Sequence, residues 1–273
     1  MSLMLGQITP VLLTYNEEDN LSRVLARLDW AGDIVIVDSF STDRTEMIAR
    51  SHPQVRFYQR AFDSHSRQWN FAIHETAIAT EWILALDADY VLSETLIREL
   101  EQLVPEADVS GYAARFRYCI NGQPLRGSLY PLVTVLYRRG KGSYEQDGHT
   151  QRLELPGKMG YLRSVIYHDD RKSLARWYAA QQRYAGLEAD HLLNRAPSLL
   201  SFGDRIRLRG WAAPLLVALY AGIFKGCFLD GRRGLFYVFQ RVLVELLIAL
   251  AIMDRKLKNV EGGALRDEPR DGE

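Results

Sequence analysis

Short apolar runs alternate with amphipathic segments over residues 8–86, and this alternation restricts the possible fold more than any other feature of the sequence. Four runs have the length and β-branched composition of buried parallel strands: Ile8 to Thr14, Ile34 to Val37, Val55 to Tyr58 and Trp82 to Leu86. Helices are expected between them, the first capped by Asn16 with the apolar residues Leu21, Val24, Leu25 and Leu28, the others over Thr42 to Arg50 and Gln68 to Ile78. This order predicts βαβ units and an α/β fold with a parallel sheet.

Polar clusters follow three of the predicted strands, at Thr14 to Glu17, Asp38 to Asp43 and Asp87 to Asp89. Ligands of open α/β sheets bind at the carboxyl ends of strands, so these clusters are expected to share one edge of the sheet. A dinucleotide-binding dehydrogenase or a nucleotidyltransferase would carry a glycine-rich phosphate loop after the first strand. The segment from Thr14 to Glu18 has no glycine and two acids, which argues against both classes.

Asp87 and Asp89 lie one residue apart at the end of a buried strand. Repulsion and desolvation disfavour two ionised carboxylates there, and a hard divalent cation that also binds phosphate oxygens would relieve both. The spacing alone also fits a solvated loop or a helix N-cap.

Three motifs together resemble glycosyltransferase family 2: Thr14-Tyr15-Asn16-Glu17, Asp38-Ser39-Phe40-Ser41-Thr42-Asp43 and Ala85-Leu86-Asp87-Ala88-Asp89. They occur in the order and at the intervals of that family over roughly the first 100 residues. The resemblance implies a GT-A fold, a nucleotide-diphosphate sugar donor, a divalent metal and inversion at the anomeric carbon.

The resemblance also implies roles in nucleotide binding. It places Thr14, Tyr15 and Glu17 near the nucleoside. The carboxylate of Asp38 would accept a hydrogen bond from a uracil N–H, and Asp43 would brace the loop.

At the phosphates, the resemblance implies that Asp87 faces the ribose or the metal through water, and that Asp89 binds Mg²⁺ or Mn²⁺. His168, at the end of a later predicted strand, is implied as a third metal ligand, although a single histidine is often structural. Arg67 lies in a segment that often carries a basic residue near the phosphates, but Trp69 stands where that residue is expected.

An inverting transfer needs a base that accepts the proton of the attacking hydroxyl. The resemblance points to the segment from Tyr144 to His149, with Asp147 as the base and Glu145 as the second choice. The usual His-Glu pair of the family is replaced by Gly148-His149-Thr150-Gln151, and a surface turn without a catalytic role is the alternative.

The second half of the chain has a different character. Strands are expected over Gly111 to Tyr118, Val133 to Arg138 and Arg152 to Leu155, and a long polar helix from Ser173 through Asn194. We therefore expect a catalytic domain at 1–172, a helical extension at 173–258 and a disordered tail at 259–273.

Several later segments resemble one branch of the family, which adds glucose to the inner core of lipopolysaccharide or lipooligosaccharide. They are Arg126 to Leu136, Asp147 to Gln151, His168 to Arg171, Gln181 to Tyr184 and Lys225 to Cys227. This resemblance implies UDP-glucose as the donor and a lipid-linked or lipopolysaccharide-core glycan as the acceptor.

The helical extension contains two apolar segments, Trp211 to Phe224 and Leu235 to Met253. The first is short for a membrane span, and Gln240, Arg241 and Glu245 put a polar stripe along the second, which favours an interfacial position. Flanking basic residues fit anionic headgroups: Arg205, Arg207, Arg209, Lys225, Arg232 and Arg233. The alternatives are a hairpin buried against the catalytic domain and an interface between subunits of a homo-oligomer.

Composition limits the remaining possibilities. Lys and Arg number 34 and Asp and Glu 34, so no overall field indicates a nucleic-acid partner. Two cysteines are too few for a disulfide framework, and the N-terminus lacks a secretory pattern, so we expect a protein on the cytoplasmic face of the inner membrane. A non-catalytic membrane scaffold with the same fold is the alternative function.

Overall fold

The computed structural model describes residues 5–147 and 150–264, and for 147, 150 and 259–264 it describes the backbone alone. The chain forms two compact units, Met1–Lys172 and Ser173–Glu273.

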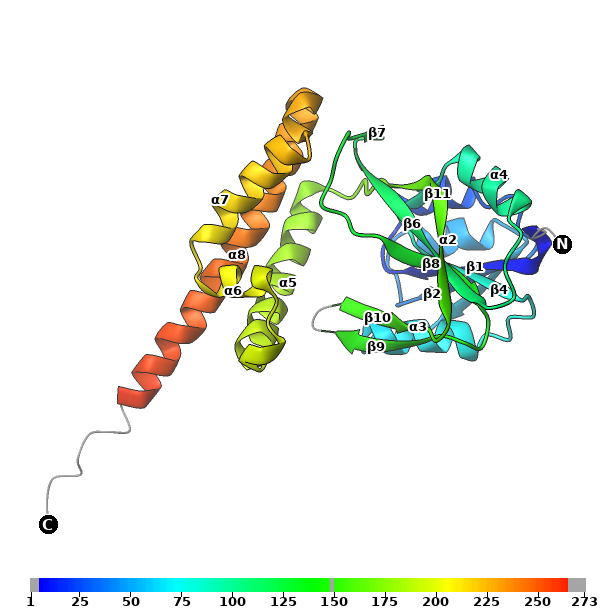
Figure 1. The fold of residues 1–273 in the computed structure, drawn as a ribbon. Coiled ribbons are helices and arrows are strands. Elements are labelled where there is room, and N and C mark those ends of the chain that lie inside the picture. Colours follow the sequence, from blue (N-terminus) through cyan, green and yellow to red (C-terminus); the bar gives the residue numbers. More distant parts are fainter. Residues whose placement is uncertain (1–4, 148–149, 265–273) are drawn as a thin grey trace, which may run out of the picture. The chain divides into compact units, whose positions relative to one another are not determined.

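The first unit is built on a mixed β-sheet (Figure 1). Its strands are β1 Ile8–Thr14, β2 Ile34–Asp38, β3 Val55–Gln59, β4 Trp82–Asp87, β5 Tyr90–Leu92, β6 Val109–Ile120, β7 Gln123–Pro124, β8 Val133–Arg138, β9 Ser143–Asp147, β10 Thr150–Glu154 and β11 Lys158–His168. Its helices are η1 Leu5–Gln7, α1 Leu21–Leu25, α2 Thr45–Arg50, α3 His65–His74 and α4 Glu94–Gln102. Among the described residues the large sheet has the order β3-β2-β1-β4-β8-β6-β11-β5, with β7 beside β6.

The strands β3, β2, β1 and β4 are parallel, as the sequence predicts, and they are buried on both faces at β1, β2 and β4. The strand β8 then runs antiparallel to both β4 and β6, which makes β6 parallel to β4. The strand β11 is parallel to β6. The carboxyl ends of β1, β2, β4, β6 and β11 therefore lie at the same edge of the sheet.

Apolar side chains cover the sheet on both faces. One core contains Leu84, Leu86, Ala114 and Phe116 of the sheet together with residues of α1 and α4. The other contains Ile83 and Ala85 together with residues of α3 and of the β9–β10 hairpin. The hairpin lies beside α3 (Figure 1).

The predicted cap of the first helix is wrong. The helix α1 begins at Leu21 after Asn20, four residues later than an Asn16 cap would place it. Asn16 has a φ of 55° and bonds to the loop after β2 instead. The tight turn after β1 needs this left-handed conformation, which asparagine adopts more readily than most residues.

The second unit is helical. It comprises α5 Leu174–Asn194, η2 Pro197–Leu199, α6 Phe202–Leu208, α7 Ala212–Leu219, the π-helical turn η3 Tyr220–Phe224, η4 Cys227–Asp230 and α8 Gly231–Ala264. The helices α5 and α8 pack through Ala185, Ala189, Leu192, Ile248 and Ile252. The helix α8 extends to Ala264, beyond the start of the tail expected from 259, and residues 265–273 of that tail lie outside the described part of the chain.

Candidate active site

The loops after β1 and β2 hold each other in place. The backbone N–H of Asn16 donates to Ser41 Oγ at 2.7 Å, and Asn16 Oδ1 accepts from the backbone N–H of Thr42 at 2.7 Å. Asp43 accepts bonds from Thr45 and from the backbone N–H of Glu18, which is the bracing role expected of it. The two loops therefore form one fixed edge of the sheet.

The carboxylate of Asp38 is fully buried and accepts three hydrogen bonds from the chain itself. The donors are Thr14 Oγ1 at 2.8 Å, the backbone N–H of Ser41 at 2.7 Å and Ser41 Oγ at 2.5 Å. A carboxylate has about four acceptor positions. One position therefore remains, and because Asp38 is fully buried, a nucleobase N–H reaches it only if the loops after β1 and β2 move.

Two aromatic side chains project from this edge. Tyr15 is 56% exposed and Phe40, which has a φ of 58°, is 52% exposed. Positive φ is a strained conformation for a bulky residue and persists where the surrounding structure imposes it. The loops thus hold two flat apolar surfaces in solvent at the carboxyl ends of β1 and β2.

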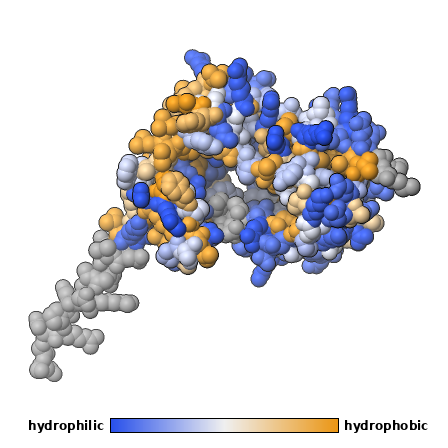
Figure 2. All heavy atoms as spheres, viewed as in Figure 1, coloured by the Kyte–Doolittle hydropathy of each residue, from blue (hydrophilic) through white to orange (hydrophobic). Residues whose placement is uncertain are grey.

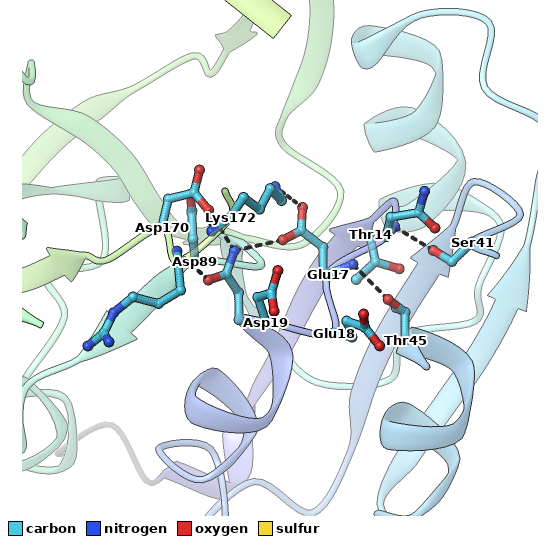
Figure 3. A network of polar contacts seen from close by, with 12 residues as sticks. Thr14, Glu17, Glu18, Asp19, Ser41, Thr45, Asp89, Asp170 and Lys172 are labelled. Carbon is cyan, nitrogen blue, oxygen red and sulfur yellow. Dashed lines mark hydrogen bonds and ion pairs between the residues drawn. The ribbon is translucent and has the colours of Figure 1, made fainter. Parts of the chain in front are cut away.

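Glu17 turns away from this surface into a polar network. Its carboxylate accepts from Lys172 Nζ at 2.5 Å and from Asn20 Nδ2 at 2.9 Å. Asn20 Nδ2 also donates to Asp170 at 2.9 Å. Figure 3 shows the Lys172 ammonium directed at Glu17, with Asp89 and Asp170 close to Lys172. The network connects the loop after β1 to the segment that follows β11.

This network shifts the pKa of its buried members. Burial raises the pKa of Glu17 from 4.5 to about 7, against the opposing charge of Lys172. Burial lowers the pKa of Lys172, but Glu17, Asp170 and Asp89 outweigh it and raise the value above normal. Lys172 is therefore a mostly buried ammonium that its carboxylate neighbours keep charged.

Asp87 and Asp89 lie at the end of β4, as predicted. Burial and the charge of Asp89 raise the pKa of Asp87 to about 6. Burial also acts to raise the pKa of Asp89, but His168 and Lys172 outweigh it and hold that pKa below the usual value. The two carboxylates therefore differ in proton affinity although they are one residue apart.

His168 ends β11 and lies beside Asp89, with His168 Nε2 3.0 Å from Asp89 Oδ2. Tyr90, Tyr118 and Tyr130 surround its ring at centroid distances of 5.5, 4.8 and 4.6 Å. Burial lowers the pKa of His168, but the charge of Asp89 outweighs it and raises the value. His168 and Asp89 thus form a mostly buried pair in which Asp89 favours the protonated imidazole.

Asp89 Oδ1 and His168 Nδ1 are buried and have no hydrogen-bond partner among the described residues. A buried polar atom without a partner is unfavourable, and such atoms often mark a site for an ion or ligand. Within residues 5–147 and 150–264, no three His, Cys, Asp or Glu side chains are grouped to enclose a metal ion, so the predicted set of Asp87, Asp89 and His168 is not assembled as a three-ligand site. Two carboxylates nevertheless fit a Mg²⁺ ion whose other ligands are water and substrate phosphates.

Arg67 does not join these residues through any described contact. Its side chain is 74% exposed on α3 and lies 3.4 Å from Asp63. Lys172 is the cation that lies among the site's carboxylates. Lys172 is not among the residues predicted for the site, although it follows His168-Asp169-Asp170-Arg171 directly in the chain.

The β9–β10 hairpin carries the predicted base. Asn70 of α3 fixes its first strand, because Asn70 Nδ2 donates to the Tyr144 carbonyl and Asn70 Oδ1 accepts from the Tyr144 N–H, both at 2.8 Å. Glu145 is exposed on β9 opposite Arg152. Asp147 ends β9 opposite Thr150, and its side chain lies outside the described part of the chain.

Similar proteins are known. The chain is 27% identical over 192 residues to "Lipopolysaccharide core biosynthesis glycosyltransferase LpsC" of Rhizobium meliloti, covering 67% of this chain and 70% of that protein. It is 25% identical over 208 residues to an uncharacterized glycosyltransferase of Rickettsia bellii, covering 71% and 70%. Among solved structures, S. aureus TarS 1-349 in complex with UDP-GlcNAc aligns over 94% of this chain and 92% of TarS, with 12% identity and a TM-score of 0.49.

The sequence model of glycosyl transferase family 2 matches residues 10–169, more than half of the 273 residues. The match spans the strands whose carboxyl ends form the site described above. The mixed sheet of the first unit agrees with the GT-A fold that the sequence predicts. The chain belongs to glycosyltransferase family 2.

Proposed function

We propose that the chain transfers a hexose, glucose in the first instance, from a UDP-sugar to a lipid-linked or lipopolysaccharide-core glycan. The reaction is a metal-assisted single displacement that inverts the anomeric carbon. The LPS-core relative from Rhizobium meliloti supports the acceptor class, and the resemblance of the motifs supports the donor and the stereochemistry.

One observation carries this proposal. Asp89 keeps a buried carboxylate oxygen without a partner beside the carboxyl group of Asp87, at the sheet edge where ligands of such folds bind. Asp89 and Asp87 would hold Mg²⁺ or Mn²⁺ there, with the neutral form of His168 as the third ligand. A bound divalent ion supplies charge stabilisation for the departing nucleotide diphosphate.

The chain's own residues would position the donor. Tyr15 and Phe40 offer exposed rings for the nucleobase, and Asp38 has an acceptor position left for the uracil N–H. Lys172 replaces Arg67 as the proposed cation at the phosphates, because it is buried among the site's carboxylates. Glu17 then orients Lys172, while Thr14 orients Asp38.

Asp147 is the proposed base, and Glu145 is the second choice. Both lie on β9. Two hydrogen bonds from Asn70 to the backbone of Tyr144 hold the start of this strand against α3. The base takes the proton of the acceptor hydroxyl as that oxygen attacks the anomeric carbon, and no covalent enzyme intermediate forms.

We also propose that the second unit meets the cytoplasmic face of the inner membrane, where a lipid-linked acceptor is available. Cys227–Lys258 is the one segment of the described chain long and apolar enough to cross a bilayer, judged by length and composition. It exposes large apolar residues that a helix on a water-soluble protein would bury. Phe239 is 62% and Leu250 63% exposed, whereas Gln240 and Glu245 are buried.

The buried polar side of α8 has a partner within the unit. Arg207 of α6 binds the Glu245 carboxylate at 2.7 Å and lies 3.6 Å from Glu188 of α5. Figure 2 shows apolar side chains gathered over the α7, η3 and α8 region. Exposed apolar residues there include Leu215, Leu219, Ile223, Phe224, Phe236, Phe239, Leu246 and Leu250. Lys225 directly follows η3, Arg232 and Arg233 lie in the first turn of α8, and all three suit anionic headgroups.

Isothermal titration calorimetry tests the donor site. UDP-glucose, UDP-galactose and UDP-N-acetylglucosamine are titrated into the full chain with and without Mn²⁺, and into Asp89→Ala. We expect metal-dependent binding that is strongest for UDP-glucose and lost in the variant. If the folded protein binds no nucleotide sugar in the presence of metal, the proposal fails and the non-catalytic scaffold takes its place.

A further inference from the structure

Arg115 and Arg117 are two exposed residues near the carboxyl end of an otherwise buried strand, β6. Neither side chain has a hydrogen bond or ion pair among the described residues. The chain has equal numbers of acidic and basic residues, so an exposed cationic pair without an acid is a local excess of charge.

The strand β6 is an interior strand, because it lies between β8 and β11 in the sheet. Its alternate residues Ala114 and Phe116 belong to the core on the α4 side. Arg115 and Arg117 therefore project from the opposite face. Most other positions of β6 are buried, so the two exposed arginines differ from the rest of the strand.

This face also carries the end of β4. Ile83 and Ala85 belong to the core opposite α4, and alternation places Asp87 on the same side. The strands β4 and β6 are parallel, so Arg117 and Asp87 lie toward the same edge of the sheet. Tyr118, the next residue after Arg117, points to the other face, where its ring lies 4.8 Å from that of His168. The arginine pair thus lies at the carboxyl edge of the sheet on the Asp87 side, across the sheet from the Tyr118–His168 contact.

We infer that Arg115 and Arg117 bind an anionic group, a carboxylate or a phosphate, on the acceptor glycan. Residues two apart on a strand are separated by about 7 Å, so both guanidinium groups can reach one anion. Arginine matches carboxylate and phosphate with two parallel N–H donors. The donor diphosphate has Lys172 and the metal-binding carboxylates, so the arginine pair is available for the second substrate. This inference rests on the proposed function and narrows its acceptor to acidic glycans.

The test uses small acidic sugars as probes on the full chain. Mannose 6-phosphate, glucuronate and neutral mannose are titrated with and without saturating UDP and Mn²⁺, and binding is followed by NMR of the arginine Nε–Hε groups. The double variant Arg115→Gln/Arg117→Gln is compared with Arg98→Gln/Arg163→Gln, which removes two exposed arginines elsewhere in the first unit.

We expect the acidic sugars to bind more tightly than mannose, and the first double variant to weaken them about tenfold or more while the control does not. Binding of UDP is expected to be equal in all three proteins. Arg115→Lys/Arg117→Lys, which keeps the charge and loses the paired donors, should give an intermediate affinity.

Equal binding of acidic sugars by wild type and Arg115→Gln/Arg117→Gln would overturn the inference and leave the donor site intact. A parallel loss of UDP binding in that variant would also overturn it, because the arginines would then belong to the donor. A failure of the wild type to bind UDP, with acidic sugars still bound through the arginines, would instead contradict the proposed function.

Discussion

Lys172 Nζ lies 2.5 Å from the Glu17 carboxylate, and this ion pair joins the last residue of the first unit to the loop after β1. The two residues are 155 positions apart in the sequence. Both side chains are mostly buried, at 22% and 11% exposure. The pair therefore links the two segments at this polar edge of the sheet. Its net charge depends on whether Glu17 is protonated.

The stability of the first unit should depend on the titration of Glu17. Its pKa is raised from 4.5 to about 7, so the folded protein holds this proton more tightly than the unfolded chain. The stabilisation from the proton is complete below pH 4.5 and is lost as the pH rises through about 7. The loss is on the order of 3 kcal/mol at most.

Glu17→Gln should lack this dependence. The difference in free energy of unfolding between wild type and Glu17→Gln is expected to fall between about pH 5 and pH 8, measured by hydrogen exchange at the amides of β1 and β4. Glu18→Gln, which alters the neighbouring half-buried carboxylate, is the control. A difference that stays constant with pH would show that Glu17 is ionised in the folded protein throughout.

Substitutions of the two acids of β9, Asp147 and Glu145, should differ in their effect on kcat. Asp147→Asn is expected to reduce kcat by about 100-fold or more while UDP-sugar affinity stays unchanged, because a base acts after the donor is bound. Glu145→Gln should have a small effect, since Glu145 is exposed opposite Arg152. Single-turnover transfer and calorimetry on each variant measure both quantities. The reverse order of effects would make Glu145 the base.

The anchor of the hairpin should matter to transfer. Asn70→Ala removes both hydrogen bonds to the Tyr144 backbone and leaves that carbonyl and N–H without their partner. We expect a loss of about 1–3 kcal/mol in local stability and a lower kcat, with UDP affinity kept. His74→Ala, at an exposed position on the same helix, is the control. Unchanged kcat in Asn70→Ala would show that the hairpin does not carry the base.

The parallel half of the sheet could be predicted because strands that are buried on both faces are apolar at nearly every position. Ile34, Val35, Ile36 and Val37 alternate between the two cores, so every position of β2 before Asp38 is apolar. The aspartates that end β2 and β4 were found for the same reason, since a charged residue ends such a run abruptly.

Contacts between loops that are far apart in the chain produce no such pattern in the sequence and could not be predicted from it. Asn16 has the composition of a helix cap, but its partner Thr42 is 26 residues away and draws it into a left-handed turn. Arg67 has the right charge for a phosphate contact, yet its position on α3 exposes it. Lys172 was missed because its acidic neighbours come from three separate segments of the chain.

Helix α8 has exposed apolar residues on the side that faces away from its unit. The sequence predicts a polar stripe at Gln240, Arg241 and Glu245 that favours an interfacial position, but Gln240 and Glu245 are buried within the unit, with Glu245 bound by Arg207. The exposed side then consists of apolar residues such as Phe239 and Leu250, which lower the free energy when lipid replaces water around them.

Phe239→Asp/Leu250→Asp should therefore weaken binding of the full chain to vesicles of phosphatidylglycerol and phosphatidylethanolamine, measured by co-sedimentation. Leu187→Asp, at an exposed leucine on α5, is the matched control and should bind as the wild type does. Arg207→Leu is expected to destabilise the unit by about 3–5 kcal/mol, because it leaves the Glu245 carboxylate buried without its partner. If Phe239→Asp/Leu250→Asp leaves vesicle binding unchanged and instead converts an oligomer to a monomer in gel filtration, the apolar face of α8 is an interface between copies of the chain.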